Sequence, residues 1–228
     1  RRGHGPWAAT YGAKAAIIAG CSSTSNILAG VKYDYGSSGT MAHSYVTAFG
    51  CSVEGEFKAY DTYIKTHKGE PLIMLIDTYD TLRCGILNAM RAFRKNGIDD
   101  SYAAGYGVRL DSGDLAYLSK KIRKMLNEAG FPDCDIYASN SLDEYIIREM
   151  LGHGARVDGF LVGERLITSA DAPVFSGVYK LAAVEKENQD KIRRAIYGDR
   201  AFGGAAPTLD EQRKDTAPIM DNAARELK

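Results

Sequence analysis

Charged residues are concentrated in one short segment, Val108–Leu115, which reads VRLDSGDL and carries Arg109, Asp111 and Asp114. A short extended run precedes this segment and an amphipathic helical pattern follows it, so the charges lie at a strand-to-helix turn. An arginine guanidinium binds phosphate well. A carboxylate beside it can hold ribose hydroxyls, orient a metal-bound pyrophosphate, or stabilise positive charge that develops on a sugar carbon. The segment therefore has the residue types of an anion-binding site.

The same residues also allow a structural interpretation. Arg109 and Asp111 can form a simple ion pair, and Asp111 or Ser112 can cap the helix that follows. Asp114 would stabilise a first helical turn without any ligand, because a helix N-terminus favours negative charge. Spacing alone leaves the ligand-binding and the structural interpretations open.

Two other turns are candidates for chemistry. In the segment Gly39–Ser44, GTMAHS, His43 lies between small and hydroxyl residues where a helix is predicted to begin. A lone histidine is more often structural than catalytic. Gly163 follows an apolar strand, and its turn could offer backbone N–H groups to a terminal phosphate, although such a glycine is a weak signal on its own.

The elements that would position these residues repeat from about residue 70 onward, as an apolar run, a polar end and an amphipathic helix. Strands are predicted at residues 72–76, 105–110, 135–138 and 159–162. A capping box at Ser141–Glu144 predicts the start of a helix over residues 142–151. Successive units of this kind are typical of a parallel sheet. We expect an α/β fold, with a (β/α) barrel or part of one as the first choice and an open doubly wound sheet as the second.

Both architectures place active sites at the carboxyl ends of their strands. The residues expected to meet at one rim are therefore Asp77, Arg109, Asp111, Ser139, Asn140 and Gly163. Before residue 70, helices are predicted over residues 6–16, 44–49 and 54–66, and an extended segment over residues 31–37. Beyond residue 186 large apolar residues are few, so residues 1–185 are expected to form the barrel portion and residues 186–228 a divergent tail or a partial second domain.

Composition narrows the class of protein. The 228 residues contain 29 Lys plus Arg and 29 Asp plus Glu, a balance that gives no bulk attraction for nucleic acid or an anionic membrane. The four cysteines are widely spaced without a C-x-x-C pair, which argues against a zinc site or a disulfide framework and fits a reducing cytoplasm. No apolar run is long enough to span a bilayer. These features predict a cytoplasmic α/β enzyme or binding protein with an anion site.

A series of motifs adds a resemblance. RR and GP near the first residues are followed in order by CSSTSNILAG, GTMAHS, LIDTYDT, GVRLDSGDL, ASNSLD, GERLIT and GVYKL. This ordered series resembles the nicotinate phosphoribosyltransferase family over roughly residues 1–185, and the order is far more specific than any single motif. The chain begins with Arg1 rather than Met and opens inside the first motif, so we interpret it as a fragment.

The resemblance implies an activity and a fold. Members of the family make nicotinate mononucleotide and pyrophosphate from nicotinate and phosphoribosyl pyrophosphate, the opening step of NAD salvage. They use Mg²⁺ and couple the reaction to ATP hydrolysis through a transient phosphohistidine. Their fold is an irregular (β/α) barrel of the type II phosphoribosyltransferase kind, which we expect to be incomplete in this chain. They are usually homodimers with the active site at the subunit interface.

The resemblance also implies catalytic residues. His43 corresponds to the histidine that accepts phosphate from ATP, and Thr40 and Ser44 beside it are expected to contact phosphates. Arg109 and Asp111 correspond to a pair at the ribose and base side of the active site. The reaction implied is displacement at C1 of the ribose through a loose, oxocarbenium-like transition state.

Further residues are implied to bind the substrates. Arg1 corresponds to an arginine that packs against the pyridine ring and the substrate phosphate, and Arg2 is its neighbour in the motif. Ser25 stands where related nicotinamide-using enzymes carry Asp, and an uncharged residue there favours the acid, nicotinate. The residues implied to hold the 5′-phosphate are Ser139, Asn140 and Gly163.

Two alternatives to an active enzyme of this family stay open. The family motif before Arg1 includes an aromatic residue that stacks on the pyridine, and it lies outside this sequence. The chain would then be a non-catalytic fragment that keeps the fold and some affinity for ligands. The other alternative is a different phosphate-binding barrel enzyme, such as a lyase that acts on a phosphorylated sugar.

Overall fold

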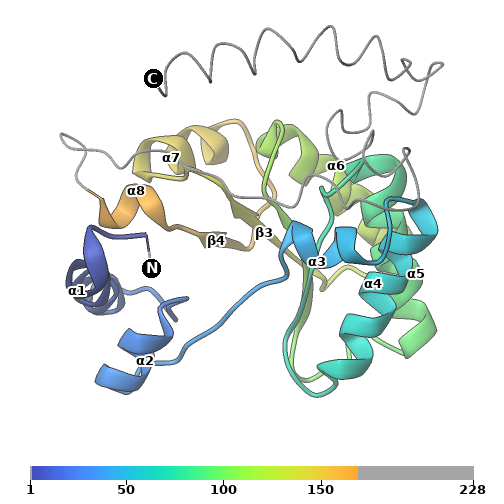
Figure 1. Cartoon of the computed structure of the whole chain (residues 1–228). Coiled ribbons are helices and arrows are strands. Elements are labelled where there is room, and N and C mark those ends of the chain that lie inside the picture. The colour runs from blue at the N-terminus through green and yellow to red at the C-terminus, as the bar shows by residue number, and fades with distance from the viewer. Residues whose placement is uncertain (1, 169–228) are drawn as a thin grey trace, which may run out of the picture. The chain divides into compact units, whose positions relative to one another are not determined.

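A computed structural model describes residues 2–168 of the chain, and its central element is a parallel sheet (Figure 1). The strands lie in the order β1 (Leu72–Leu75), β2 (Tyr106–Leu110), β3 (Asp135–Ser139) and β4 (Gly159–Leu161). Arg1, the boundary predicted near residue 185 and the tail predicted at 186–228 lie outside the described residues.

Neighbouring strands of the sheet are also consecutive in the chain. Leu75 pairs with Arg109, Leu110 with Ala138, and Ser139 with Leu161, all in parallel register. The carboxyl ends of all the strands of a parallel sheet lie at one edge, so the turns that follow these strands are neighbours. The predicted α/β fold with successive parallel units is confirmed. The strand order does not reverse within residues 2–168, and closure of the sheet into a barrel stays a prediction.

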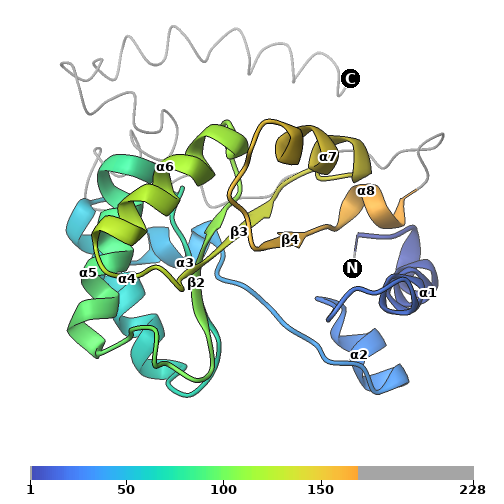
Figure 2. The same ribbon diagram turned by 180° about the vertical axis from the view of Figure 1, so that it is seen from behind.

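Helices connect the strands (Figure 2). A π-helical turn, η1 (Thr81–Gly85), leads from β1 into α5 (Ile86–Asn96); α6 (Leu115–Glu128) follows β2, α7 (Glu144–Gly152) follows β3, and α8 (Glu164–Ile167) follows β4. One large core joins β1, β2 and the start of β3 to α5 and α6, and β1 contributes side chains to it that are completely buried, including Leu72, Met74 and Leu75. A second, smaller core joins the end of β3 to α7 and β4. A continuous apolar strand such as β1 is typical of a sheet that is covered on both faces.

The predicted helices before the sheet are confirmed. They are α1 (Gly5–Ile18), α3 (His43–Ala48) and α4 (Val53–Thr66). The extended segment predicted over residues 31–37 is wrong, because its first part belongs to a helix, α2 (Ile27–Tyr33). The Asn26 side chain accepts the N–H of Ala29, and this N-cap starts a helix that runs through the β-branched and aromatic residues until Asp34 ends it in a left-handed conformation.

Two helix starts differ from the sequence interpretation. The capping box predicted at Ser141–Glu144 is wrong, because Asp143 is the N-cap of α7 and Ser141 has a positive φ of 50°. The cap of α6 is Asp114, whose carboxylate accepts the N–H of Tyr117, and neither Asp111 nor Ser112 takes that position. Asp111 and Ser112 are therefore available for other contacts. In residues 2–168 no helix has both the length and the apolar character needed to cross a membrane.

Asp61 joins α4 to α5 through one buried carboxylate. Its Oδ2 accepts hydrogen bonds from Nζ of Lys65 at 2.8 Å and Nζ of Lys95 at 2.9 Å, and its Oδ1 accepts one from Nδ2 of Asn96 at 2.9 Å. Burial raises the pKa of Asp61, but the hydrogen bonds from Lys65, Lys95 and Asn96 outweigh burial and hold that pKa well below its ordinary value.

Asp61→Asn is expected to lower the free energy of unfolding at pH 7 by ~1–3 kcal/mol, because two ammonium groups lose their carboxylate partner. A lowered folded-state pKa means that the stabilisation is present above the pKa of an unfolded aspartate and is lost as the pH falls through the folded pKa. The difference between parent and variant should therefore shrink below about pH 4. Urea unfolding of the parent and of Asp61→Asn at pH 7 and pH 3 measures this difference in the free energy of unfolding. Asp133→Asn, in an exposed turn, is the control, and an equal loss there would contradict a specific role for Asp61.

Candidate functional site

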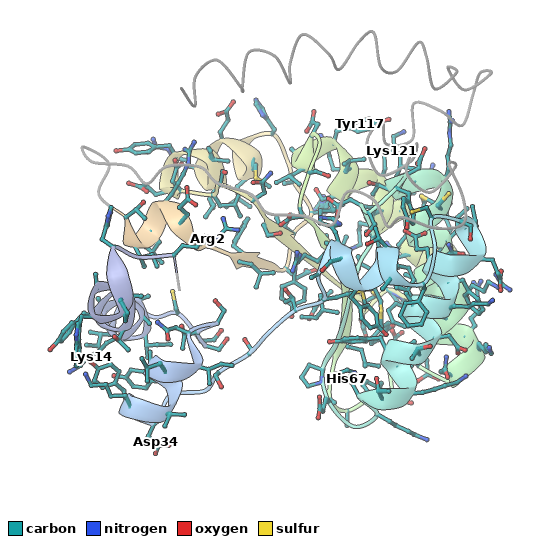
Figure 3. All side chains as sticks on the ribbon, viewed as in Figure 1. Arg2, Lys14, Asp34, His67, Tyr117 and Lys121 are labelled. Atoms are coloured by element: carbon teal, nitrogen blue, oxygen red, sulfur yellow. The ribbon has the colours of Figure 1, made fainter. Side chains whose placement is uncertain are left out.

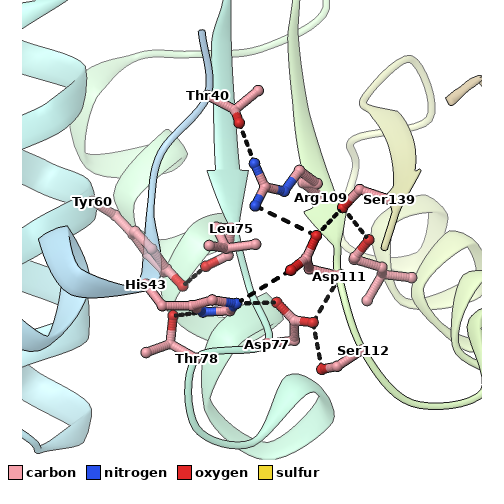
Figure 4. A network of polar contacts seen from close by, with 11 residues as sticks. Thr40, His43, Tyr60, Leu75, Asp77, Thr78, Arg109, Asp111, Ser112 and Ser139 are labelled. Atoms are coloured by element: carbon pink, nitrogen blue, oxygen red, sulfur yellow. Dashed lines mark hydrogen bonds and ion pairs between the residues drawn. The ribbon is translucent and has the colours of Figure 1, made fainter. Parts of the chain in front are cut away.

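The site begins with Asp77, the second residue after β1. Its side chain is 1% exposed, and its Oδ2 accepts hydrogen bonds from the N–H of Asp111 at 2.8 Å and the hydroxyl of Ser112 at 2.6 Å (Figure 4). Both donors belong to the turn after β2. One buried carboxylate therefore ties together the carboxyl ends of two neighbouring strands, and it fixes the backbone on which Asp111 stands.

His43, the first residue of α3, lies against this link. Its Nδ1 is 3.1 Å from Oγ1 of Thr78, while its Nε2 is 3.9 Å from Oδ1 of Asp77 and 3.7 Å from Oδ2 of Asp111. The side chain is 34% exposed, so the ring is held by polar groups and still has an open edge. This combination is required of a histidine that exchanges protons or a phosphoryl group with a ligand.

Arg109 is the fourth residue of β2 and points toward the same group (Figure 4). Its Nη1 donates to the hydroxyl of Thr40, and its Nη2 lies 3.6 Å from Oδ1 of Asp111. The guanidinium is largely enclosed, with 12% of the side chain exposed. The positive charge is therefore fixed between the loop before α3 and the turn after β2.

Ser139, the last residue of β3, completes the cluster. Its hydroxyl donates to Oδ1 of Asp111 and also lies 3.1 Å from the carbonyl oxygen of Leu110. Burial raises the pKa of Asp111, but the contacts from His43 and Ser139 and the charge of Arg109 outweigh burial and hold that pKa below its ordinary value. Asp111 is therefore ionised at neutral pH, and 31% of its side chain is exposed to a ligand.

Local sequence explains why the end of β1 is held so firmly. Asp80 accepts the N–H groups of Leu82 and Arg83, which starts η1 only a few residues after the strand. Gly85, at the end of η1, packs directly on the backbone of Ile76, where an added Cβ would lie 1.8 Å from the carbonyl oxygen. Only glycine allows this close approach, so η1 packs directly on the strand end that carries Asp77.

The structure brings together only some of the residues predicted from the sequence. His43, Thr40, Arg109, Asp111 and Ser139 join the cluster, and the roles predicted for them stay predictions.

The remaining predicted residues lie elsewhere. Ser25 and Ser44 are exposed, and no hydrogen bond or ion pair within residues 2–168 joins their side chains to the cluster. Arg2, which is labelled in Figure 3, pairs with Glu164 of α8 with 3.4 Å between Nη1 and Oε2. Asn140 is exposed with a φ of 83°, and Gly163 precedes α8 without a contact to the cluster. Both stand just after the carboxyl ends of their strands, at the edge of the sheet where the cluster lies, and no hydrogen bond or ion pair within residues 2–168 joins either of them to it, so their role in binding phosphate stays a prediction.

Sequence reasoning placed Asp77 at the rim without a role and gave none to Thr78. Both residues contact His43, and Asp77 also supports the Asp111 turn. The available signal was their position: two polar residues follow the apolar run at residues 72–76, as Asp111 and Ser112 follow β2. Within residues 2–168 no group of three or more His, Cys, Asp and Glu side chains is placed to hold a metal ion.

The arrangement combines a fixed cation, an ionised and partly exposed carboxylate, and a partly exposed imidazole at one edge of the sheet. Such a set can bind an anionic ligand through Arg109, stabilise positive charge beside Asp111, and receive or return a proton or phosphoryl group at His43. A substitution reaction at the sugar carbon of a phosphorylated sugar requires these three capabilities.

Known proteins with similar sequence and structure point in the same direction. No protein-family model matches the chain. A nicotinate phosphoribosyltransferase of Bacillus subtilis (strain 168) is 47% identical over 189 residues, which are 83% of this chain and 37% of that protein. Among solved structures, the nicotinate-nucleotide pyrophosphorylase of Pyrococcus furiosus matches 72% of this chain and 40% of its own with a TM-score of 0.59 and 27% identity. The human nicotinic acid phosphoribosyltransferase matches 70% of this chain and 41% of its own, with a TM-score of 0.56 and 26% identity.

The chain spans less than half the length of each of these proteins. The resemblance seen in the motifs is therefore confirmed by the relatives, and it concerns part of their length.

Ser139→Ala is expected to raise the pKa of Asp111, because the carboxylate loses a hydroxyl donor that favours its ionised form. The carboxyl ¹³C chemical shift of Asp111, followed over a pH titration, measures this pKa. Since the folded pKa moves up toward that of an unfolded aspartate, the stability that Asp111 contributes at neutral pH should become smaller, and its loss on acidification should be complete at a higher pH. Ser38→Ala, whose hydroxyl pairs with that of Ser23 at 2.7 Å, is the matched control. An unchanged Asp111 titration in Ser139→Ala would contradict the interaction.

Proposed function

We propose that this chain, a homologue of the nicotinate phosphoribosyltransferases, carries the phosphoribosyl-transfer part of such an enzyme. The reaction would join nicotinate to phosphoribosyl pyrophosphate and yield nicotinate mononucleotide and pyrophosphate. The observation that carries the proposal is the cluster of His43, Arg109 and Asp111, in which motifs 66 to 68 residues apart in the sequence meet at the rim of the sheet. The 47% identity with the Bacillus subtilis enzyme supports the choice of substrates.

The bond changes at the sugar follow from the charges of the cluster. The pyridine nitrogen of nicotinate forms a bond to C1 of the ribose as the bond from C1 to the pyrophosphate oxygen breaks. Positive charge develops on the ribose in the transition state, and the ionised carboxylate of Asp111 is suited to stabilise it. Arg109, fixed by Thr40 and Asp111, would attract the negatively charged phosphates of the substrate.

ATP would act through His43. A ring nitrogen of His43 would accept the γ-phosphoryl group of ATP, with release of ADP, and water would later cleave the P–N bond to give free phosphate. The exposed edge of the ring and its polar supports are consistent with this role. Ser44, exposed in the first turn of α3, and Thr40 would contact the phosphates nearby.

Mg²⁺ fits the cluster as an ion carried by the substrate. Mg²⁺ needs only one or two protein carboxylates when pyrophosphate oxygens supply other ligands, and it would neutralise charge on the leaving pyrophosphate. Asp111 is the residue that would hold it, because Ser139 and Arg109 contact Oδ1 and leave Oδ2 facing His43.

The remaining parts of the proposal concern residues outside the cluster. Ser25 would favour nicotinate over its amide, Arg1 and Arg2 would lie near the base, and Ser139, Asn140 and Gly163 would contact the 5′-phosphate. A homodimer and a cytoplasmic location belong to the same proposal. They are supported by the resemblance and by the cysteine spacing, respectively.

The test is an assay of the chain with nicotinate, phosphoribosyl pyrophosphate, Mg²⁺ and ATP, with pyrophosphate release as the measurement. His43→Ala is expected to abolish the stimulation of turnover by ATP, because the phosphoryl acceptor is lost. Asp111→Asn is expected to lower kcat by about 100-fold or more, because the charge that stabilises the transition state is removed.

His153→Ala, which truncates an exposed histidine after α7, is the control and should keep the parent turnover. ATP stimulation that survives in His43→Ala would rule out the phosphoryl-acceptor role. Binding of phosphoribosyl pyrophosphate by calorimetry without any pyrophosphate release would favour the alternative of a non-catalytic fragment. Turnover with a phosphorylated sugar but not with nicotinate would favour the lyase alternative.

A further inference from the structure

The hydroxyl of Tyr60 on α4 contacts the last residue of β1. Its O–H donates to the carbonyl oxygen of Leu75 at 2.7 Å, and both residues are completely buried (Figure 4). We propose that Tyr60 is a positioning residue, which holds the carboxyl end of β1 and thereby fixes Asp77 and the turn that carries Asp111. The inference rests on the proposed function, since Asp111 is the carboxylate that acts on the ribose in that function.

The carbonyl group of Leu75 lies on the side of β1 that faces away from the sheet. β1 stands at one end of the strand order, and the N–H of Ile76 donates to the carbonyl oxygen of Arg109 in β2 at 3.2 Å. Backbone groups of successive residues point to opposite sides of a strand, so the C=O of Leu75 points away from β2. Within residues 2–168 no strand pairs with that edge. A buried carbonyl oxygen without a donor costs about 1–3 kcal/mol, and the Tyr60 hydroxyl removes this cost.

The core keeps the Tyr60 hydroxyl a donor and keeps it in place. Burial and the neighbouring Glu56 raise the pKa of Tyr60 well above its ordinary value, so the hydroxyl retains its proton. Nδ2 of Asn88 on α5 donates to Oε2 of Glu56 at 2.9 Å and to the carbonyl oxygen of Val53, the first residue of α4, also at 2.9 Å. Glu56 is completely buried, so this link lies inside the core. The packing of α4 on α5 therefore sets the point from which Tyr60 donates.

Three consecutive residues at the end of β1 are thus held by three different elements. The first, Leu75, accepts the hydrogen bond from Tyr60 of α4. The second, Ile76, has Gly85 of η1 packed on its backbone. The third, Asp77, accepts two hydrogen bonds from the turn after β2. Loss of the hydroxyl releases the first residue, and the displacement passes to the third along two backbone units.

Two tyrosines allow a matched comparison. Tyr60→Phe removes the hydroxyl and keeps the ring. Tyr106→Phe is the control, because Tyr106 is also buried and its hydroxyl donates to Oδ1 of Asp100 at 2.5 Å. Tyr106 is the first residue of β2 and therefore lies at the opposite edge of the sheet from the cluster. Each variant loses one hydrogen bond of a buried tyrosine, and only Tyr60→Phe loses it at the rim.

Folding of the variants is controlled in two ways. All samples contain sucrose, which stabilises folded proteins because it is excluded from their surface. Asn88→Ala is a second variant in case Tyr60→Phe does not fold, since it releases α4 from α5 and leaves the hydroxyl of Tyr60 in the chain.

The first measurement is the backbone amide proton signal of Asp111 in ¹⁵N-labelled protein without substrates. This N–H donates to Oδ2 of Asp77 at 2.8 Å, so its chemical shift reports the link that Tyr60 is proposed to hold. The signal is expected to move upfield in Tyr60→Phe and in Asn88→Ala, because the hydrogen bond lengthens. It should keep its parent position in Tyr106→Phe.

The second measurement is the steady-state rate of pyrophosphate release by the same proteins. Tyr60→Phe is expected to lower kcat about 10-fold or more, because a misplacement of about 1 Å can cost about 100-fold in rate. The KM for phosphoribosyl pyrophosphate should change less than about threefold, since the carboxylate of Asp111 acts mainly on charge that develops in the transition state. Tyr106→Phe should keep both constants.

The outcomes separate the inference from the proposed function. Absence of pyrophosphate from the parent counts against the proposed function and leaves the amide signal of Asp111 to decide on Tyr60. An Asp111 signal that stays at its parent position in Tyr60→Phe and Asn88→Ala would overturn the inference. An equal change of the signal and of kcat in Tyr106→Phe would also overturn it, because the effect would then be one of general stability.

Discussion

The carboxylate of Asp77 is the interaction on which the site depends. It is almost wholly buried, and its Oδ2 accepts the N–H of Asp111 and the hydroxyl of Ser112, so the ends of β1 and β2 cannot move apart independently. A buried charge is tolerated only where it is paired or hydrogen-bonded, and these donors satisfy that condition from an adjacent strand. The position of Asp111, and through it of the whole cluster, follows from this one link.

The two aspartates of the cluster have the same chemistry and different surroundings. The Asp77 side chain is 1% exposed and accepts hydrogen bonds from the backbone of Asp111 and the side chain of Ser112. The Asp111 side chain is 31% exposed and presents one oxygen to His43. The buried carboxylate is therefore suited to support and the open one to contact a ligand. Arg109, Ser139 and His43 together keep the open carboxylate ionised, so its negative charge is available near neutral pH.

Support for the site extends into the helical layer. The hydroxyl of Tyr60 on α4, a completely buried side chain, donates to the carbonyl oxygen of Leu75 at 2.7 Å, directly before Ile76 and Asp77. Asp61, the next residue of α4, holds this helix to α5 through Lys95 and Asn96. The packing of α4 and α5 therefore reaches the strand end that carries Asp77, and the stability of the helical pair and the geometry of the rim are physically connected.

The sequence by itself determined the alternation of apolar strands and amphipathic helices, because burial of β1 on both faces and the heptad-like stripe of α6 leave direct patterns in residue type. It also determined that Arg109 and Asp111 stand at a strand end, and its motif order indicated the family. Only the tertiary structure decided that Asp114 caps α6, that Asp143 caps α7, and that residues 31–33 are helical. It alone brought Thr78 and Asp77 to His43, which is 34 residues or more away in the chain. Helix caps depend on competition between nearby polar side chains for the same backbone N–H groups. Long-range contacts depend on which strands lie side by side. The periodicity of apolar residues along the chain contains neither kind of information.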